Sequence, residues 1–355
     1  MKQRIGHWLG LMVCAFTASA QQAIELNQVN LSRWGIGTAH YSGITSLGNQ
    51  RYAVVSDKEP QDGFYLFRIE QDAHTGEVTS VALEGFRGNP AAQVDQKGIS
   101  VRDAEGIAFF PQAQTLFISG EGDQAVWEYS IDGKPTGRGL QIPESFSVKN
   151  IRPNCGFEAL AYDTCRHRFW TITETMLPAD GVAAGPEHPD GQNLLRLLAF
   201  DDQLQCVEQY PYRMDRGICE DFGMTYVFGV PALTALPDGS LLVLEREANV
   251  SRGYLSSTVR CKLFRVWPAK ETAIDAATDL NTLDNNRFMT KLLLADFTTR
   301  LTPFNYTFAN YEGMCLGQTL VDGRRTLLLV NDSQGGFGKG PVRLKDFVKV
   351  LILPD

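Results

Sequence analysis

Acidic residues recur at matching positions of a repeated sequence pattern. Each copy begins with a small or acidic residue and Gly or Ala, continues through an apolar segment and a turn, and ends with a β-rich segment that leads into an acid. The five copies begin at Ser42, Glu105, Glu158, Pro231 and Glu312, and they end at Asp57, Glu121, Glu174, Glu247 and Asp332. Carboxylates that recur in this way can bind a cation or serve as acids and bases once the fold brings them together.

Further strand-like segments follow each copy, so each unit offers three or four strands. The units carry turn signals and show no regular helical period, which is typical of propeller blades. We therefore predict an all-β fold, a β-propeller of five blades with six as the alternative, that occupies residues 21–355 as a single domain. Residues 23–34 are expected to close the ring by pairing with the last blade.

The strand directions within a blade predict which acids meet. The innermost strand starts on one face of the ring and the second strand returns to that face, so the start of one lies beside the end of the other. The resulting pairs are Glu105 with Glu121, Glu158 with Glu174, Glu312 with Asp332, and Ser42 with Asp57. Ring closure then gathers them around one mouth of the central channel. Carboxylates packed this closely repel one another unless protons, Arg or a metal compensates, and calcium suits such a set because it takes about six to eight oxygen ligands.

Candidate site residues follow from this arrangement. We expect Asp57, Glu105, Glu158, Glu247, Glu312 and Asp332 to hold calcium, Glu121 and Glu174 to act in catalysis, and Arg246 and Lys58 to bind an anionic substrate group. The alternative for each acid is a turn cap or a bond to the next blade, and for Arg246 it is a salt bridge that balances its acidic neighbours. His40 could act as an acid or base at the mouth, although a surface or core position is favoured.

The composition narrows the class of function. The chain has 33 Lys and Arg against 41 Asp and Glu, which argues against nucleic acid or an anionic membrane as a partner. A substrate that carries phosphate would need a bound cation to offset the repulsion. The sequence has no H-E-x-x-H or other zinc spacing and no G-x-S-x-G segment, so neither a zinc enzyme nor an α/β serine hydrolase is expected.

The first residues have the pattern of a secretory signal. Lys2 and Arg4 precede an apolar segment over residues 8–16, and Ala18-Ser19-Ala20 forms a small-residue cleavage site. We expect cleavage after Ala20 and a periplasmic or secreted protein with no membrane span, because no later segment is long and apolar enough to form one.

The six cysteines that follow this segment are an even number, which favours disulfides in an exported chain. Their positions within the expected blades predict the pairs Cys155 with Cys219, Cys165 with Cys206, and Cys261 with Cys315.

Four short segments share a further similarity, namely D-A-E-G-I-A at 103–108, F-E-A-L-A-Y-D at 157–163, A-L-P-D-G-S-L-L-V-L-E-R-E at 235–247 and N-Y-E-G-M at 310–314. In their order and number they resemble the phytase-like propeller family that is described as having esterase-like activity of phytase. The resemblance runs over nearly the whole chain after the signal, and it implies a β-propeller, calcium dependence and phosphomonoester hydrolysis. Propellers that hydrolyse phytate carry many Lys and Arg near their calcium ions, whereas the repeat ends here offer mainly Lys58 and Arg246.

Three functions remain open from the sequence. The first is an exported, calcium-assisted phosphoesterase in which a spare carboxylate such as Glu121 acts as base. The second is a calcium-dependent lactonase or carboxylesterase, which would need fewer basic residues and a more apolar mouth. The third is a non-catalytic propeller that binds a ligand on its channel face. For the enzymes we expect a small-molecule ester or phosphoester as substrate, and we expect a monomer.

Overall fold

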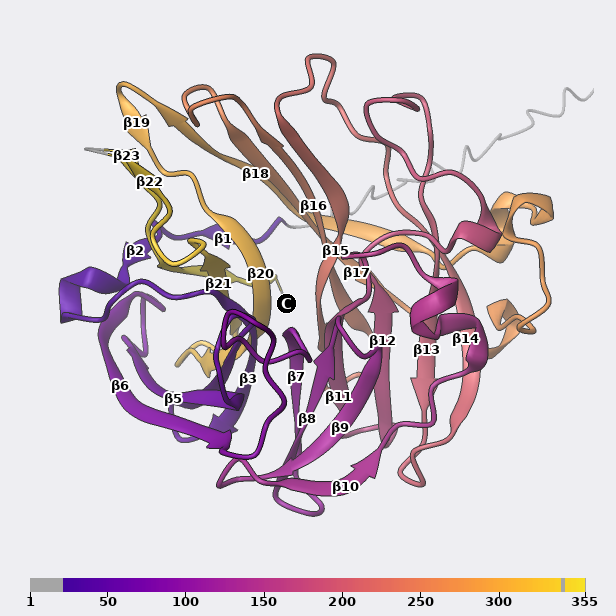
Figure 1. Ribbon diagram of the computed structural model, residues 1–355, viewed down its shortest axis with the longest axis horizontal. Helices are drawn as coiled ribbons and strands as arrows, with labels where there is room; N and C mark the ends of the chain where they lie inside the picture. The colour runs from indigo at the N-terminus through magenta and orange to yellow at the C-terminus, as the bar shows by residue number, and fades with distance from the viewer. Residues whose placement is uncertain (1–21, 340–341, 355) are drawn as a thin grey trace, which may run out of the picture.

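The computed structural model describes residues 22–339 and 342–354, and within these residues the fold is built from β-strands and short 3-10 helices. Five antiparallel sheets are arranged as the blades of a propeller around a central channel (Figure 1). The prediction of an all-β, five-bladed propeller is therefore confirmed. The predicted signal segment, residues 1–20, lies outside the described residues.

The first three blades each have four strands in chain order. Blade 1 comprises β3 (Tyr41–Gly48), β4 (Arg51–Ser56), β5 (Asp62–Gln71) and β6 (Val78–Asn89). Blade 2 comprises β7 (Ala104–Phe110), β8 (Thr115–Gly120), β9 (Ala125–Ser130) and β10 (Pro135–Gly139). Blade 3 comprises β11 (Phe157–Asp163), β12 (Arg168–Thr173), β13 (Leu194–Phe200) and β14 (Cys206–Arg213).

Blade 4 is the longest sheet. It contains β15 (Thr225–Ala235), β16 (Leu241–Val250), β17 (Thr258–Val266), β18 (Lys291–Thr302) and the short β19 (Asn305–Tyr306). Blade 5 contains β20 (Asn310–Thr319), β21 (Arg325–Asp332) and β24 (Phe347–Ile352), and a small hairpin of β22 (Gly338–Lys339) and β23 (Val342–Arg343) stands beside it.

The N-terminal segment completes blade 5, as predicted. Strand β1 (Ile24–Glu25) pairs with β24 through Ile24 and Ile352, and β2 (Val29–Asn30) pairs with the same strand through Val29 and Val348. Because the two ends of the chain share one sheet, opening the ring requires breaking these strand pairs.

Short 3-10 helices lie between strands. They are η1 (Leu31–Trp34), η2 (Glu144–Phe146), η3 (Val148–Asn150), η4 (Pro178–Asp180), η5 (Lys270–Thr272), η6 (Leu280–Thr282) and η7 (Asn285–Arg287). In the described residues no helix has the length and apolar character required to cross a bilayer.

The hydrophobic core is divided among the interfaces between blades. In β8, Leu116 and Ile118 pack toward blade 1, whereas Phe117 between them packs toward blade 3. Successive side chains of a strand point to opposite faces, so a strand that lies between two neighbouring blades buries both faces. This is why interior strands such as β8 and β13 are continuous apolar segments, whereas the outer strands β6 and β10 are largely exposed.

The structure corrects the disulfide prediction, since the six described cysteines are all unpaired. Cys165 lies in the turn between β11 and β12, and Cys206 begins β14, so about two strand spacings separate them. Cys155 and Cys219 flank the innermost and outermost strands of the same blade, and Cys261 and Cys315 lie in different sheets. Strands lie about 4.8 Å apart, and a disulfide requires Cα atoms within about 7 Å. The prediction considered only which face of the ring each cysteine lies on, and not its distance across the blade.

Candidate functional site

The inner strand of each blade has a β-bulge at the channel mouth, and this bulge determines which side chains reach the mouth. The pairing of first and second strands shifts between Tyr41 and Ile44, Ala104 and Ile107, Phe157 and Ala159, Gly229 and Ala232, and Tyr311 and Gly313. Bulges redirect a side chain and are common next to active sites. The bulged residues include Ser42, Glu105, Glu158 and Glu312, while blade 4 has Val230 and Pro231 there.

Glycines next to the bulges let the inner strands approach closely. A Cβ on Gly43 would lie 2.5 Å from the carbonyl oxygen of Glu105, and one on Gly106 would lie 2.6 Å from that of Glu158. A Cβ on Gly313 would lie 2.3 Å from the carbonyl oxygen of Ser42. Only a residue without Cβ fits at these positions. The channel is therefore narrow at this depth, and the acids are held close together.

The blade 1 and blade 2 side of the mouth holds a compact group of three carboxylates, from Asp57, Asp103 and Glu105. One oxygen from each lies within 4.8 Å of the others. Lys58 Nζ lies 2.7 Å from Asp57 Oδ2 and 2.6 Å from Asp103 Oδ1, and Ser42 Oγ donates a hydrogen bond of 2.6 Å to Glu105 Oε2. The ammonium group of Lys58 thus contacts two of the three acids, and the third is held by the Ser42 hydroxyl.

The opposite side of the mouth is organised by Arg246, a buried residue of β16. Its guanidinium donates to Glu312 Oε1 at 2.8 Å and to Asn310 Oδ1 at 3.0 Å, forms an ion pair with Glu174, and lies 3.9 Å from Glu158. Blade 4 has no acid in its bulge, and it supplies this cation instead. The balancing salt bridge considered for Arg246 from the sequence is present.

His40 and Asp332 complete the ring between blades 1 and 5. The Nδ1 atom of His40 lies 3.6 Å from Asp57 Oδ1 and 3.6 Å from Asp332 Oδ1. The sequence favoured a surface or core position for His40, but the structure places it among the acids of the mouth.

Burial and mutual repulsion favour the neutral form of these acids. Burial raises the pKa of Glu105 well above its ordinary value, and the Glu158 carboxylate adds to the shift. Burial followed by repulsion from Glu174 does the same for Glu158, and burial followed by repulsion from Glu312 does so for Asp332. Burial also raises the pKa of Glu121 to about 7 and that of Glu312 to about 7. Strongly shifted acids gathered in one place are a feature of functional sites.

One buried acceptor of the cluster has no hydrogen-bond partner within the described structure. Asp57 Oδ1 is shielded from solvent and accepts no hydrogen bond, although His40 Nδ1 lies 3.6 Å from it, while the other oxygen of the same carboxylate contacts Lys58. A buried carboxylate oxygen without a hydrogen bond is costly, and a cation would satisfy it.

Nine of the ten predicted site residues lie around this mouth, although not all in the expected pairs. Glu158 and Glu174 are neighbours, as are Glu312 and Asp332. Glu105 lies instead beside Asp57 and Asp103, and Glu121 turns toward blade 3, where its Oε1 accepts the Gly156 N–H at 3.1 Å.

Glu247, the tenth, lies away from the mouth. Strand β16 runs on to Val250, so Glu247 is not at a strand end, and its side chain is on the face opposite Arg246. There it accepts the N–H groups of Ile218 and Cys219 at 2.9 Å each and the Tyr226 hydroxyl at 2.9 Å.

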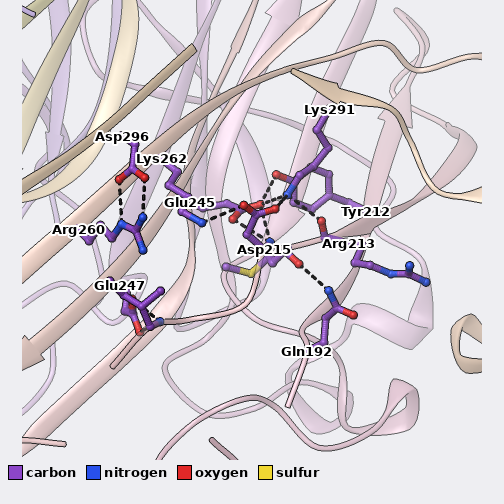
Figure 2. Close-up of polar contacts among 12 residues, drawn as sticks. Gln192, Tyr212, Arg213, Asp215, Glu245, Glu247, Arg260, Lys262, Lys291 and Asp296 are labelled. Carbon is purple, nitrogen blue, oxygen red and sulfur yellow. Dashed lines mark hydrogen bonds and ion pairs between the residues drawn. The ribbon is translucent and has the colours of Figure 1, made fainter. Parts of the chain in front are cut away.

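Glu245 shares that opposite face and anchors the connection between blades 3 and 4 (Figure 2). It accepts hydrogen bonds of 2.6 Å from both Tyr212 Oη and Lys291 Nζ, and Lys262 Nζ lies 2.9 Å from Asp215 in the connection. Alternation along β16 therefore directs Arg246 to the mouth and both flanking glutamates to a structural network.

Besides His40, two residues of the site were not predicted from the sequence as site residues. Asp103 precedes Glu105 by two positions in the D-A-E-G-I-A segment, and Asn310 precedes Glu312 by two positions in N-Y-E-G-M. The shared polar-x-Glu spacing was the available signal, since alternate residues of a strand share a face.

A cavity of about 290 Å³ opens at the end of the channel opposite the carboxylate ring. It is lined by the far ends of the inner strands, including Phe109, Tyr162, Leu233 and Met314, and by none of the acids of the mouth.

Fold and site together define a five-bladed β-propeller with a carboxylate ring at one mouth of its channel. The chain belongs to the phytase-like family described as esterase-like activity of phytase, whose sequence profile matches residues 36–334. This confirms the resemblance noted in the sequence.

Solved structures with a similar arrangement are distant. An endo-arabinase from Bacteroides thetaiotaomicron is 11% identical, with a TM-score of 0.44 and coverage of 93% of this chain and 98% of that chain. A PQQ-bound aldose sugar dehydrogenase from Streptomyces coelicolor is 12% identical, with a TM-score of 0.40 and coverage of 93% and 98%. A virginiamycin B lyase from Staphylococcus aureus is 10% identical, with a TM-score of 0.34 and coverage of 92% and 99%. A search of curated proteins gave no significant match.

Proposed function

We propose that the chain is a calcium-dependent hydrolase of ester bonds, with phosphoesters as the first substrate class. The observation that carries this proposal is the group of Asp57, Asp103 and Glu105, whose oxygens lie within 4.8 Å of one another. The family description, esterase-like activity of phytase, agrees with the reaction class.

The donor set suits calcium. It consists of carboxylate oxygens without sulfur ligands, which is the preference of a hard cation, and Asp57 Oδ1, which accepts no hydrogen bond, is available to it. We assign Asp57, Asp103 and Glu105 as the first ligands, with Glu158, Glu312 and Asp332 as the acids around them. When bound, calcium would supply Lewis acidity toward the ester oxygen and lower the pKa of a coordinated water.

Glu121 is the best-placed general base. Its carboxyl group is partly exposed at the mouth, and a pKa of about 7 lets it take a proton at neutral pH and return it later. Gly156 N–H holds Glu121 Oε1, which leaves the Oε2 atom to receive the proton. Glu174, the other predicted catalytic residue, is buried against Arg246, so we assign it the role of positioning that guanidinium.

Lys58 and Arg246 are both engaged by carboxylates. Burial lowers the pKa of Lys58, but its hydrogen bonds to Asp103 and Asp57 outweigh burial and raise it overall. The ammonium group is therefore positively charged and orients two ligands, and its side chain is 36% exposed, so it can also meet an anionic substrate group. Arg246 is buried among its acids and shapes the ring rather than binding substrate.

A carboxylic ester or lactone is the second candidate substrate. Two observations favour it, namely the engagement of both cations by protein acids and an apolar cleft beside the ring, which is described below. A carboxylic ester is neutral, so calcium could polarise its carbonyl oxygen without a second cation of the kind that a charged phosphate group would need.

The signal-like residues 1–20 support export to the periplasm or beyond, where calcium is plentiful. We propose that residues 21–355 act there as one monomeric propeller domain.

The test combines turnover and metal binding. Phosphomonoesters, phosphodiesters, carboxylic esters and lactones are assayed with calcium and again after chelation, and calcium is titrated calorimetrically into wild type, Glu105→Gln and the control Glu144→Gln. Glu144 is a surface residue with a side chain 74% exposed. We expect chelator-sensitive turnover, and weaker calcium binding in Glu105→Gln alone. Equal calcium affinity in all three proteins, or turnover that survives chelation, would refute the proposal, and absence of turnover on every ester would leave the non-catalytic reading.

A further inference from the structure

Blade 4 projects beyond the channel mouth. Of the five inner strands in the described parts of the chain, β15 alone begins well before its bulge, and its residues Thr225 to Phe228 pair with Val250 to Glu247 of β16. The hairpins of this blade extend away from the channel in Figure 1. The first hairpin therefore forms a wall beside the carboxylate ring.

The two faces of this wall differ in character. Tyr226 and Glu247 face the connection from blade 3, where they hydrogen-bond to each other. Val227, Ala248 and Val250 alternate with them and face blade 5. Arg246 shares that face of β16 with Ala248 and Val250, so the apolar surface starts directly beside the ring.

This surface lines a cleft of about 90 Å³, which we call the apolar cleft. The residues that line it include Thr225, Ala248, Val250, Tyr254, Asn310 and Asp332. Asp332 and Asn310 belong to the carboxylate ring, so cleft and ring are continuous. The ring of Tyr254, a lining residue, packs against that of Phe337, with ring centroids 5.6 Å apart. Among the described residues, no lysine or arginine lines the cleft.

We propose that the apolar cleft binds the non-reacting, apolar part of the ester substrate. This inference rests on the proposed function of the ring. A ligand site that is mostly apolar with a few polar groups at one end fixes both the affinity and the orientation of its ligand. Here the polar end is the ring, and the apolar end accepts a short alkyl group or the edge of a small ring. The volume corresponds to roughly three water molecules. The substrate class is therefore an ester with one compact apolar substituent, not a polyphosphorylated one.

The direct test measures binding, so it does not depend on turnover. Phosphonates resemble both a phosphoester and the tetrahedral species of carboxylic ester hydrolysis, and they resist hydrolysis. Calorimetry with methyl-, propyl-, butyl- and hexylphosphonate in calcium should show affinity rising about threefold to fourfold per methylene over the first three or four carbons, then levelling off. Equal affinity for all four phosphonates would overturn the inference.

Variants that fill the apolar cleft with a larger side chain test whether the chain-length dependence of affinity arises there. Ala248→Phe fills the cleft, so hexylphosphonate should bind that variant no more tightly than methylphosphonate does. Thr225→Phe fills it from an exposed edge and provides the second variant if Ala248→Phe does not fold. Val321→Phe is the matched control, because Val321 is 69% exposed in the turn after β20. A chain-length dependence that persists unchanged in both filled variants would place the apolar group elsewhere, for example in the cavity of about 290 Å³.

These experiments distinguish failure of the proposed catalytic function from failure of the cleft proposal. If no ester is hydrolysed but phosphonate affinity depends on chain length and on Ala248, the cleft stands and the catalytic proposal fails. If esters are hydrolysed at rates independent of chain length, the catalytic proposal stands and the cleft fails. If phosphonates do not bind, hexanol is added to protein labelled at alanine methyl groups, and an unshifted Ala248 resonance overturns the cleft.

Discussion

Replacing Arg246 with Met tests the electrostatic account of the mouth. The guanidinium is the cation that Glu174, Glu312 and Glu158 share, at 2.8 Å from Glu312 and 3.9 Å from Glu158. Removing one partner from a buried ion pair typically costs about 3–5 kcal/mol, because the remaining charges lose their compensation. We therefore expect Arg246→Met to lower the free energy of unfolding by about 4 kcal/mol in chelator at pH 8, and the melting temperature by roughly 6 °C.

The loss of unfolding free energy in Arg246→Met should depend on pH and on calcium. The remaining glutamates can take up protons, so the difference between variant and wild type should shrink as the pH falls toward 5.5. Calcium should recover part of the stability at pH 8 and bind the variant more tightly, since a nearby positive charge is gone. Thermal and urea melts of Arg246→Met are compared with those of Arg265→Met, whose partner Asp238 lies at the surface and whose loss should cost about 1 kcal/mol or less. Equal costs for the two variants, or a penalty that does not change with pH, would refute the reasoning.

Three further outcomes follow from the structure. First, the calcium-free protein should lose stability as the pH rises from about 4.5 to 7, because Glu312 has a pKa of about 7 when folded and near 4.5 when unfolded, so the native state holds more protons in this window. Glu312 accounts for about 3 kcal/mol at most, and urea melts across this range in chelator and in calcium check both the fall and its suppression by the metal. Second, Gly106→Ala should destabilise by about 1–3 kcal/mol, since its Cβ would lie 2.6 Å from the Glu158 carbonyl oxygen, whereas Gly37→Ala, with nothing within 4 Å, should change the melt little. Third, deletion of residues 22–30 removes two strands from blade 5 and should lower the melting temperature of the whole fold in calorimetry; an unchanged single transition would contradict closure through these strands.

The blade architecture could be predicted because it depends on local patterns. Segments such as Leu116 to Ser119 are apolar on both faces, as interior blade strands must be, and turn residues such as Pro237-Asp238-Gly239 separate them. Ring closure by the N-terminal segment followed from the need to cover an edge strand. The disulfide prediction failed because it used strand order only to assign each cysteine to a face of the ring, and not to estimate the distance between the paired cysteines.

The membership of the carboxylate ring was largely predictable, while its internal pairing was not. Bulges and glycines decide the pairing, and neither the bulge at Ala104 to Ile107 nor the approach of Gly106 to blade 3 is visible as a strand pattern. Glu247 was assigned to the mouth because its strand was expected to end there. The strand continues to Val250, and continuing it turns Glu247 to the opposite face.

The interruption of the repeat in blade 4 explains why positive and negative charges are distributed unevenly around the carboxylate ring. Pro231 occupies the bulge where other blades place Glu105, Glu158 or Glu312, and the cation from β16 neutralises the acids on that side. The side formed by blades 1 and 2 keeps three acids against the single ammonium of Lys58. A divalent cation is attracted to the side with uncompensated negative charge and repelled by a fixed guanidinium. The same blade that lacks the acid also supplies the apolar wall, so a substrate bound along that wall would present its ester group toward the side where we place calcium.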